Sequence, residues 1–173
     1  TNSLSLSAKL NRNNSMRLSI SDTRSESITP NSPAMRQSIK LNSHNKVNNW
    51  LSMNTSITYY RRDCDNLPQM GYGQASVMYS LWCMAPNINM DWARDYWIDP
   101  GVQQNANLTG AKNNPYFVAY ECLNTLDRDR IFGNTSLDLH LYKGLDLMLR
   151  GGIDFSRDHR TMRQPKSSYS QRY

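Results

Sequence analysis

The stretch DWARDYWID, residues 91 to 99, holds the side chains best suited to chemistry in this sequence. Asp91, Asp95 and Asp99 recur at four-residue spacing, which on a helical turn would place their carboxylates on one face, as a cation or sugar site requires. Trp92 and Trp97 lie among them, and an indole ring can stack on the face of a sugar. A solvated loop face and aromatic packing within an ordered loop remain the favoured interpretations.

The histidines and cysteines show no catalytic or metal-binding spacing. Of the histidines at positions 44, 140 and 159, only His140 falls inside a predicted strand, and a solvated or lumen-lining role is favoured over a ligand role. The three cysteines lack CxxC spacing and favour neither zinc nor a disulfide framework, although one pairing involving Cys64 or Cys83 stays open. We therefore expect no enzyme activity, no catalytic residue, no metal and no cofactor.

Charge and hydropathy argue against two further classes of protein, nucleic-acid-binding proteins and helical membrane proteins. The net charge is +6, but the basic residues are dispersed along the chain instead of forming a patch, so nucleic-acid binding is not expected. No run approaches the roughly 18 to 20 apolar residues of a membrane helix. The chain also opens in mid-alternation, at TNSLSLSAKL, and we expect a segment of a longer protein.

Six segments alternate apolar and polar residues with period two, which predicts an all-β, antiparallel arrangement. The connections between them are alternately short and long, and the longest, residues 62–127, forms an insert. This parity is typical of a membrane β-barrel, whose turns are short at one end and long at the other. The predicted strands are 3–10, 16–23, 35–43, 50–61, 128–141 and 146–158.

One face of these strands is leucine-rich, and the sequence offers no second sheet or set of amphipathic helices to cover it. Lipid would cover it without a second layer. The insert is aromatic and contains a predicted short helix over 72–84 and a second helical turn starting at Asn114 and Pro115. An insert of this length in a compact unit is usually functional or disordered, and its aromatic content favours order.

Two stretches resemble a known family. MRLSISDTRSESITPNSPAMRQSIKLNSHNKVNNWLSMNTSITY and NNPYFVAYECLNTLDRDRIFGNTSLDLHLYKGLDLMLRGGIDF are similar to barrel hairpins of SusC/RagA-type TonB-dependent outer-membrane transporters. The resemblance covers roughly residues 3 to 62 and 113 to 166. The middle of the insert, about 63 to 112, matches less well.

The resemblance implies a transmembrane β-barrel portion, within a barrel of about 22 strands, in the bacterial outer membrane. It also implies membrane lipid around the barrel, a SusD-like surface lipoprotein partner, TonB acting through an N-terminal region that this sequence lacks, and import of oligosaccharides or peptides. All of residues 1–173 would then be one partial barrel domain.

Within that interpretation we expect two groups of site residues. The aromatic residues of the insert are candidates for substrate or partner contact: Trp82, Trp92, Tyr96 and Trp97. The polar phase of the strands is expected to face the lumen: Arg17, Lys40, Asp138, His140, Arg150 and Asp154. The alternative is a soluble or surface-attached all-β carbohydrate-binding module, which requires the leucine face to pack against a second layer.

Overall fold

The computed structural model describes residues 1–106 and 112–169. The fold is mostly β, with 58% of residues in strands and 11% in helices, and its sheets are antiparallel, as the alternation predicted. The elements in chain order are β1 (Asn2–Asn11), β2 (Asn14–Glu26), β3 (Pro33–Lys46), β4 (Leu51–Cys64), α1 (Val77–Trp82), α2 (Met90–Arg94), β5 (Trp97–Asp99), β6 (Gln103–Gln104), α3 (Pro115–Glu121), β7 (Leu123–Tyr142) and β8 (Leu145–Arg163).

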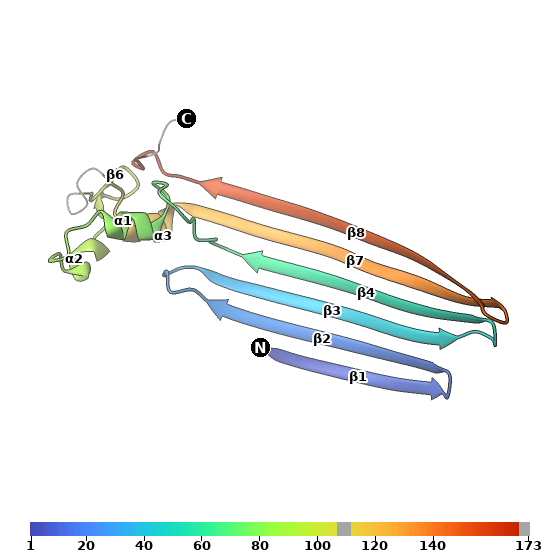
Figure 1. Cartoon of the computed structure of the whole chain (residues 1–173). Helices are drawn as coiled ribbons and strands as arrows, with labels where there is room; N and C mark the ends of the chain where they lie inside the picture. Colours follow the sequence, from blue (N-terminus) through green and yellow to red (C-terminus); the bar gives the residue numbers. More distant parts are fainter. Residues whose placement is uncertain (107–111, 170–173) are drawn as a thin grey trace. The chain divides into compact units, whose positions relative to one another are not determined.

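Six long strands form one sheet in the order β1-β2-β3-β4-β7-β8 (Figure 1). The sheet is open: among the described residues β1 and β8 each have one strand neighbour, and no closed barrel forms. In the first hairpin Leu4 faces Ile20 and Leu6 faces Leu18, while Ser7 faces Arg17, so apolar residues pair with apolar ones and polar residues with polar ones. This register follows from the side-chain period of two.

The chain divides into two compact units. The first, here called the strand unit, contains residues 1–24, 35–62 and 127–158. The second, here called the loop unit, contains residues 25–34, 63–126 and 159–173. The strand unit carries the strand alternation seen in the sequence, and the loop unit carries the helices.

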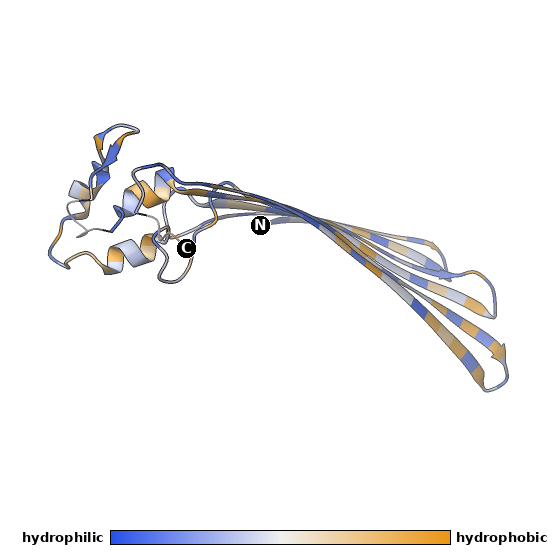
Figure 2. Ribbon diagram, turned by 90° about the horizontal axis from the view of Figure 1, so that it is seen from above, coloured by the Kyte–Doolittle hydropathy of each residue, from blue (hydrophilic) through white to orange (hydrophobic). Residues whose placement is uncertain are grey.

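The strand unit is a single layer. All of its residues are described, and none of them is buried. Figure 2 shows hydrophobic and hydrophilic residues alternating along its strands. The leucine-rich face therefore lies bare, with Leu6 60% exposed and Phe155 64% exposed.

The loop unit has its own small core. Phe117, Val118 and Cys122 are buried at its centre, and Ala75, Val77, Tyr96 and Trp97 pack against them. Helix α3 starts where the sequence directs it: Asn114 is the N-cap and its Oδ1 accepts from the backbone of Tyr116 at 2.9 Å, while Pro115 begins the helix. The neighbouring Asn113 is fully buried, and its amide donates to Gln74 O at 2.8 Å.

The strands extend beyond the predicted bounds, and three other expectations need correction. The helix predicted over 72–84 covers only Val77–Trp82, because Ser76 is its N-cap, with a side chain that accepts from Tyr79 N, and Cys83 is its C-cap. The insert also contains the two short strands β5 and β6, which were not predicted. His44 lies inside β3 and His159 inside β8, because both strands are longer than the alternation indicated.

Among residues 1–106 and 112–169, no helix is long and apolar enough to cross a membrane.

Candidate functional site

The polar face of the strand unit is joined laterally by side-chain hydrogen bonds. The hydroxyls of Ser5 and Ser19 link β1 to β2 at 3.0 Å, and those of Ser21 and Ser38 link β2 to β3 at 2.8 Å. Further along, Ser56 donates to Asn42 Oδ1 at 2.9 Å, linking β4 to β3. Polar side chains that satisfy one another across strands form a continuous hydrophilic surface, suited to water or a polar solute.

A hydrogen-bonded chain crosses the same face from β3 to β7. His44 Nδ1 donates to Asn54 Oδ1 at 2.5 Å, and Asn54 Nδ2 donates to Asp138 Oδ2 at 3.1 Å. Since the Nδ1 proton is used on Asn54, the Nε2 atom of a neutral His44 remains an acceptor. This row of hydrogen bonds holds the His44 imidazole in place through Asn54 and the Asp138 carboxylate, which lies on β7, two strands from β3.

Ion pairs occupy the part of the face formed by β7 and β8. Arg128 binds Asp158 in a bidentate manner, with Nε donating to Oδ1 at 2.6 Å, and Arg130 binds Asp154 in the same way, with Nε donating to Oδ1 at 2.8 Å. The Nδ1 atom of His140 lies 2.5 Å from Oδ1 of Asp146. The two Arg–Asp pairs neutralise their carboxylates locally, and because they are partly exposed each contributes little stability.

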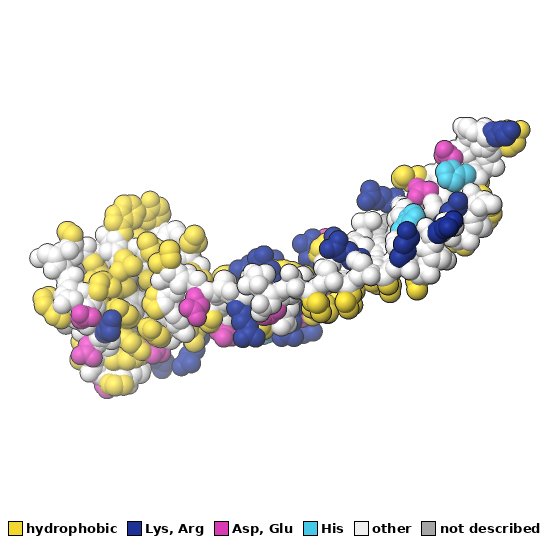
Figure 3. Space-filling view, turned by 90° about the horizontal axis from the view of Figure 1, so that it is seen from below, with side chains coloured by type: hydrophobic (Ala, Val, Ile, Leu, Met, Phe, Trp, Pro, Cys, Tyr) yellow, Lys and Arg dark blue, Asp and Glu magenta, His cyan; other side chains and the backbone are white. Residues whose placement is uncertain are grey.

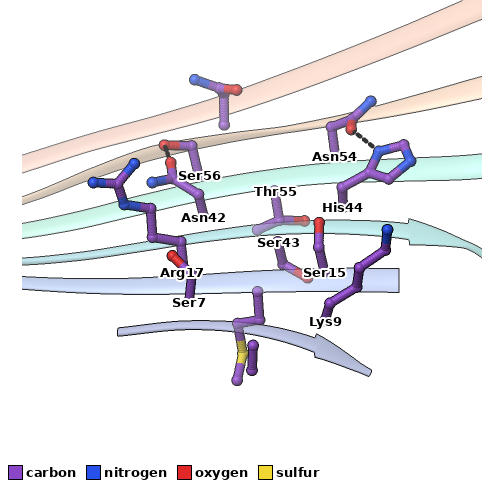
Figure 4. A pocket seen from close by; sticks show the side chains of 13 residues that line it. Ser7, Lys9, Ser15, Arg17, Asn42, Ser43, His44, Asn54, Thr55 and Ser56 are labelled. Carbon is purple, nitrogen blue, oxygen red and sulfur yellow. Dashed lines mark hydrogen bonds between the residues drawn. The ribbon is translucent and has the colours of Figure 1, made fainter. Parts of the chain in front are cut away.

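Between β1 and β4 the polar face contains an open hollow of about 540 Å³ (Figure 4). Its basic residues are Lys9, Arg17 and His44, and the figure shows them on strands that flank the hollow. Serine hydroxyls and asparagine amides supply most of the other polar groups: Ser7, Ser15, Asn42, Asn54, Ser56 and Asn134. Such a lining can donate hydrogen bonds to oxygens of a polar solute.

The residues expected to face the lumen do not form one cluster. Arg17 lines the hollow, and Asp138 is connected to it through Asn54. Lys40 lies on β3 outside the lining, while His140 and Asp154 are held by charged partners further along the sheet. Sequence reasoning missed Lys9, although this residue lies on the polar phase of the predicted strand 3–10. It also missed His44, which lies on the polar phase of β3 but beyond the end of the predicted strand 35–43.

The four aromatic candidates of the insert separate into two kinds. Tyr96 and Trp97 pack against the core, and both donate to Glu121 Oε1 at 3.4 Å. Burial and the nearby Glu121 carboxylate raise the pKa of Tyr96. These two residues therefore stabilise the loop unit.

Trp82 and Trp92 are exposed instead. Trp82 is 72% exposed and lies 5.7 Å, centroid to centroid, from the ring of Tyr72, which is 69% exposed. The two rings are tilted by 34° to each other, and each exposes surface on which a ligand could stack. Sequence reasoning did not identify Tyr72.

The carboxylates with four-residue spacing do not share a helical face. Asp91 lies in α2, where it pairs with Arg94 at 3.3 Å, whereas Asp95 is the C-cap and Asp99 lies in β5. Within residues 1–106 and 112–169, no group of three or more His, Cys, Asp or Glu could hold a metal ion. The cysteines are unpaired, with Cys64 and Cys122 buried and Cys83 exposed.

Comparison with models of protein families finds no match to this chain, and comparison with curated proteins finds none either.

Proposed function

We propose that the strand unit is part of a transmembrane β-barrel in the bacterial outer membrane, belonging to a TonB-dependent transporter of the SusC/RagA type. The observation that carries the proposal is the bare leucine-rich face of the strand unit, a single layer in which no residue is buried. A soluble sheet needs a second layer over such a face, whereas lipid covers it directly.

The connections support the same proposal. The turns β1–β2, β3–β4 and β7–β8 are short and lie at one end of the sheet in Figure 1, while the link between β4 and β7 contains the helices. Strands of 10 to 20 residues also match or exceed the roughly 9 to 11 that a tilted strand needs to cross a bilayer. Further strands would pair with the edges β1 and β8 to close the barrel.

In this mechanism no covalent bond changes. The polar face lines a lumen, its hydrogen-bonded side chains replace water around a passing oligosaccharide or peptide, and the exposed aromatics Trp82 and Trp92 contact the solute or a SusD-like lipoprotein. In that family TonB acts on a plug domain, and we assign none of the residues described to that domain.

Lipid exposure can be tested at two adjacent positions of β3. In the full-length protein with Cys83→Ser, Ile39→Cys and Lys40→Cys are labelled separately with an environment-sensitive fluorophore, and the protein is placed in liposomes. Because neighbouring residues of a strand point to opposite faces, brominated lipid should quench the label at 39 and aqueous iodide the label at 40. Equal quenching of both labels by iodide would show that water or protein, not lipid, covers the leucine face.

Transport is tested separately in cells. Uptake of labelled oligosaccharides and peptides is compared between cells with and without the gene, and between cells with and without TonB. Uptake that is independent of the gene or of TonB contradicts the transport assignment.

A carbohydrate-binding module is the second candidate, and the exposed Tyr72–Trp82 pair is the observation that favours it. This candidate requires a water-soluble protein that loses affinity for sugars when Trp82 is replaced by Ala. It also requires a second copy or another layer to protect the label at position 39 from both quenchers.

A further inference from the structure

The acidic residues of the polar face are confined to two of its six strands. The polar phase of β1, β2, β3 and β4 within the fully described strand unit contains no Asp or Glu. Its basic residues are Lys9, Arg17, Arg36, Lys40, Lys46 and Arg62. The aspartates of the face all lie on β7 and β8.

Those aspartates are already engaged. Asp154 and Asp158 bind arginines of β7, Asp146 binds His140, and Asp138 accepts from Asn54. By contrast, Lys9 and Arg17 form no ion pair with any described residue, and both are exposed. In the right-hand part of the strand region in Figure 3, Lys, Arg and His side chains gather on one side and hydrophobic side chains on the other, whereas further left Lys and Arg side chains lie on both sides.

Lys9 and Arg17, which form no ion pair with any described residue, both line the hollow. Lys9, Arg17 and His44 line it, no carboxylate does, and Ser7 lies directly opposite Arg17 in the strand register. A guanidinium, an ammonium and neighbouring hydroxyls are the donors that bind carboxylate or sulfate oxygens. The charge is therefore complementary to a solute anion.

The rest of the lining favours a sugar over a peptide. Serine and asparagine side chains both donate and accept, as paired sugar hydroxyls require. Phe, Tyr, Trp, Leu, Ile and Val are absent from the described lining residues. The two apolar residues of the lining, Ala8 and Met16, face each other on the leucine-rich phase of β1 and β2, so they offer no apolar surface on the polar face to a peptide side chain.

We propose that this hollow binds an acidic oligosaccharide, with Arg17 and Lys9 contacting its carboxylate or sulfate groups and His44, oriented by Asn54, contacting its hydroxyls. The inference rests on the proposed transport function, since it names the solute that the polar face would conduct.

Binding is measured by calorimetry on the purified full-length protein in detergent, which does not depend on uptake. The probes are a uronic acid oligosaccharide, a sulfated oligosaccharide, a neutral oligosaccharide of equal length and a tetraglutamate peptide. At low salt at least one acidic oligosaccharide should bind tenfold or more tightly than the neutral one, and 0.5 M NaCl should remove most of that difference because salt screens exposed charges. The two acidic probes show whether the bound group is a carboxylate or a sulfate.

The variants are Arg17→Gln, Lys9→Gln and the matched control Arg157→Gln, which removes the same charge from the opposite phase of β8. Arg17→Gln and Lys9→Gln should each weaken acidic-sugar binding about tenfold, while Arg157→Gln leaves it unchanged. Equal affinity for neutral and acidic sugars, equal losses in all three variants, tighter binding of tetraglutamate, or no binding at all would each overturn the inference. The lipid-quenching result would be unaffected, so the two proposals can fail independently.

Discussion

At the scale of residues, the phase along a strand determines which face of the sheet a side chain occupies, and contacts between distant parts of the sequence determine what the side chain does there. Alternation alone places Arg17 and Asp138 on the polar side of their strands, and the hydrogen bond from Asn54 to Asp138 agrees with that placement. The roles of Tyr96 and Trp97 could not be predicted, because their contacts with Phe117 and Glu121 join residues about 20 or more positions apart. Sequence spacing within DWARDYWID contains no information about such contacts.

Cys122 provides a residue-scale prediction. Burial raises the pKa of its thiol from 9.0 to about 11, despite a hydrogen bond to Ser168 that lowers it. The thiolate is the reactive form, so near pH 8 Cys122 should have about 100-fold less thiolate than an ordinary cysteine. We expect iodoacetamide to modify the exposed Cys83 first and Cys122 only upon unfolding, as followed by peptide mass spectrometry.

The raised pKa of Cys122 also determines whether the stability of the loop unit rises or falls with pH. The folded loop unit retains the thiol proton to higher pH than the unfolded chain, so its stability is fully present below pH 9 and falls as the pH rises toward about 11. Cys122→Ala should reduce this fall, because it removes the titrating group. Modification of Cys122 as rapid as that of Cys83 in the folded protein would contradict the burial on which both expectations depend.

At the scale of elements, the six alternating segments each overlap one long strand, because strand phase is a local property of the sequence. The strand ends were not predictable from alternation: β7 begins at Leu123, where polar and charged residues interrupt the pattern, yet pairing with neighbouring strands continues. The hollow was missed for the same reason, since His44 lies beyond the end of the predicted strand 35–43. The helix α3 was recognised because its signal, Asn114 followed by Pro115, is local.

Gly133 gives an element-scale prediction about the packing of β4 against β7. A Cβ atom added at this position would lie 2.6 Å from the backbone oxygen of Ser56 and 3.1 Å from Cα of Ile57. Backbone cannot move aside as a flexible side chain can, so the strands would have to separate. We expect Gly133→Ala to destabilise the sheet by about 1 to 3 kcal/mol, measured by urea unfolding in detergent.

Gly151→Ala on β8 is the matched control, because an added Cβ there meets no atom within 4 Å. Its unfolding midpoint should stay within the range of ordinary surface substitutions, about 0.5 kcal/mol. Equal effects of the two substitutions would show that loss of glycine flexibility, and not the approach of the two strands, determines the outcome.

At the scale of the whole molecule, the two units derive their stability from different sources. The loop unit buries Phe117, Val118 and Cys122 in its own core, whereas no residue of the strand unit is buried. Burial of apolar side chains is the main favourable term in folding. Under the proposed membrane location, the strand unit obtains this term from lipid or detergent on its leucine-rich face, whereas the loop unit obtains it from its own core.

Removing detergent from the full-length protein should therefore affect the two units unequally. Backbone amides of β3 and β4 should lose protection from hydrogen exchange as the leucine face meets water, while amides of α3 keep theirs; peptide-resolved mass spectrometry distinguishes the two segments. Phe117→Ala is the reciprocal control: its large buried side chain is lost from the loop unit, so protection should fall in α3 even in detergent. If β3 and β4 remain protected in water as a monomer, the strand unit has a source of stability other than lipid, and the barrel proposal is wrong.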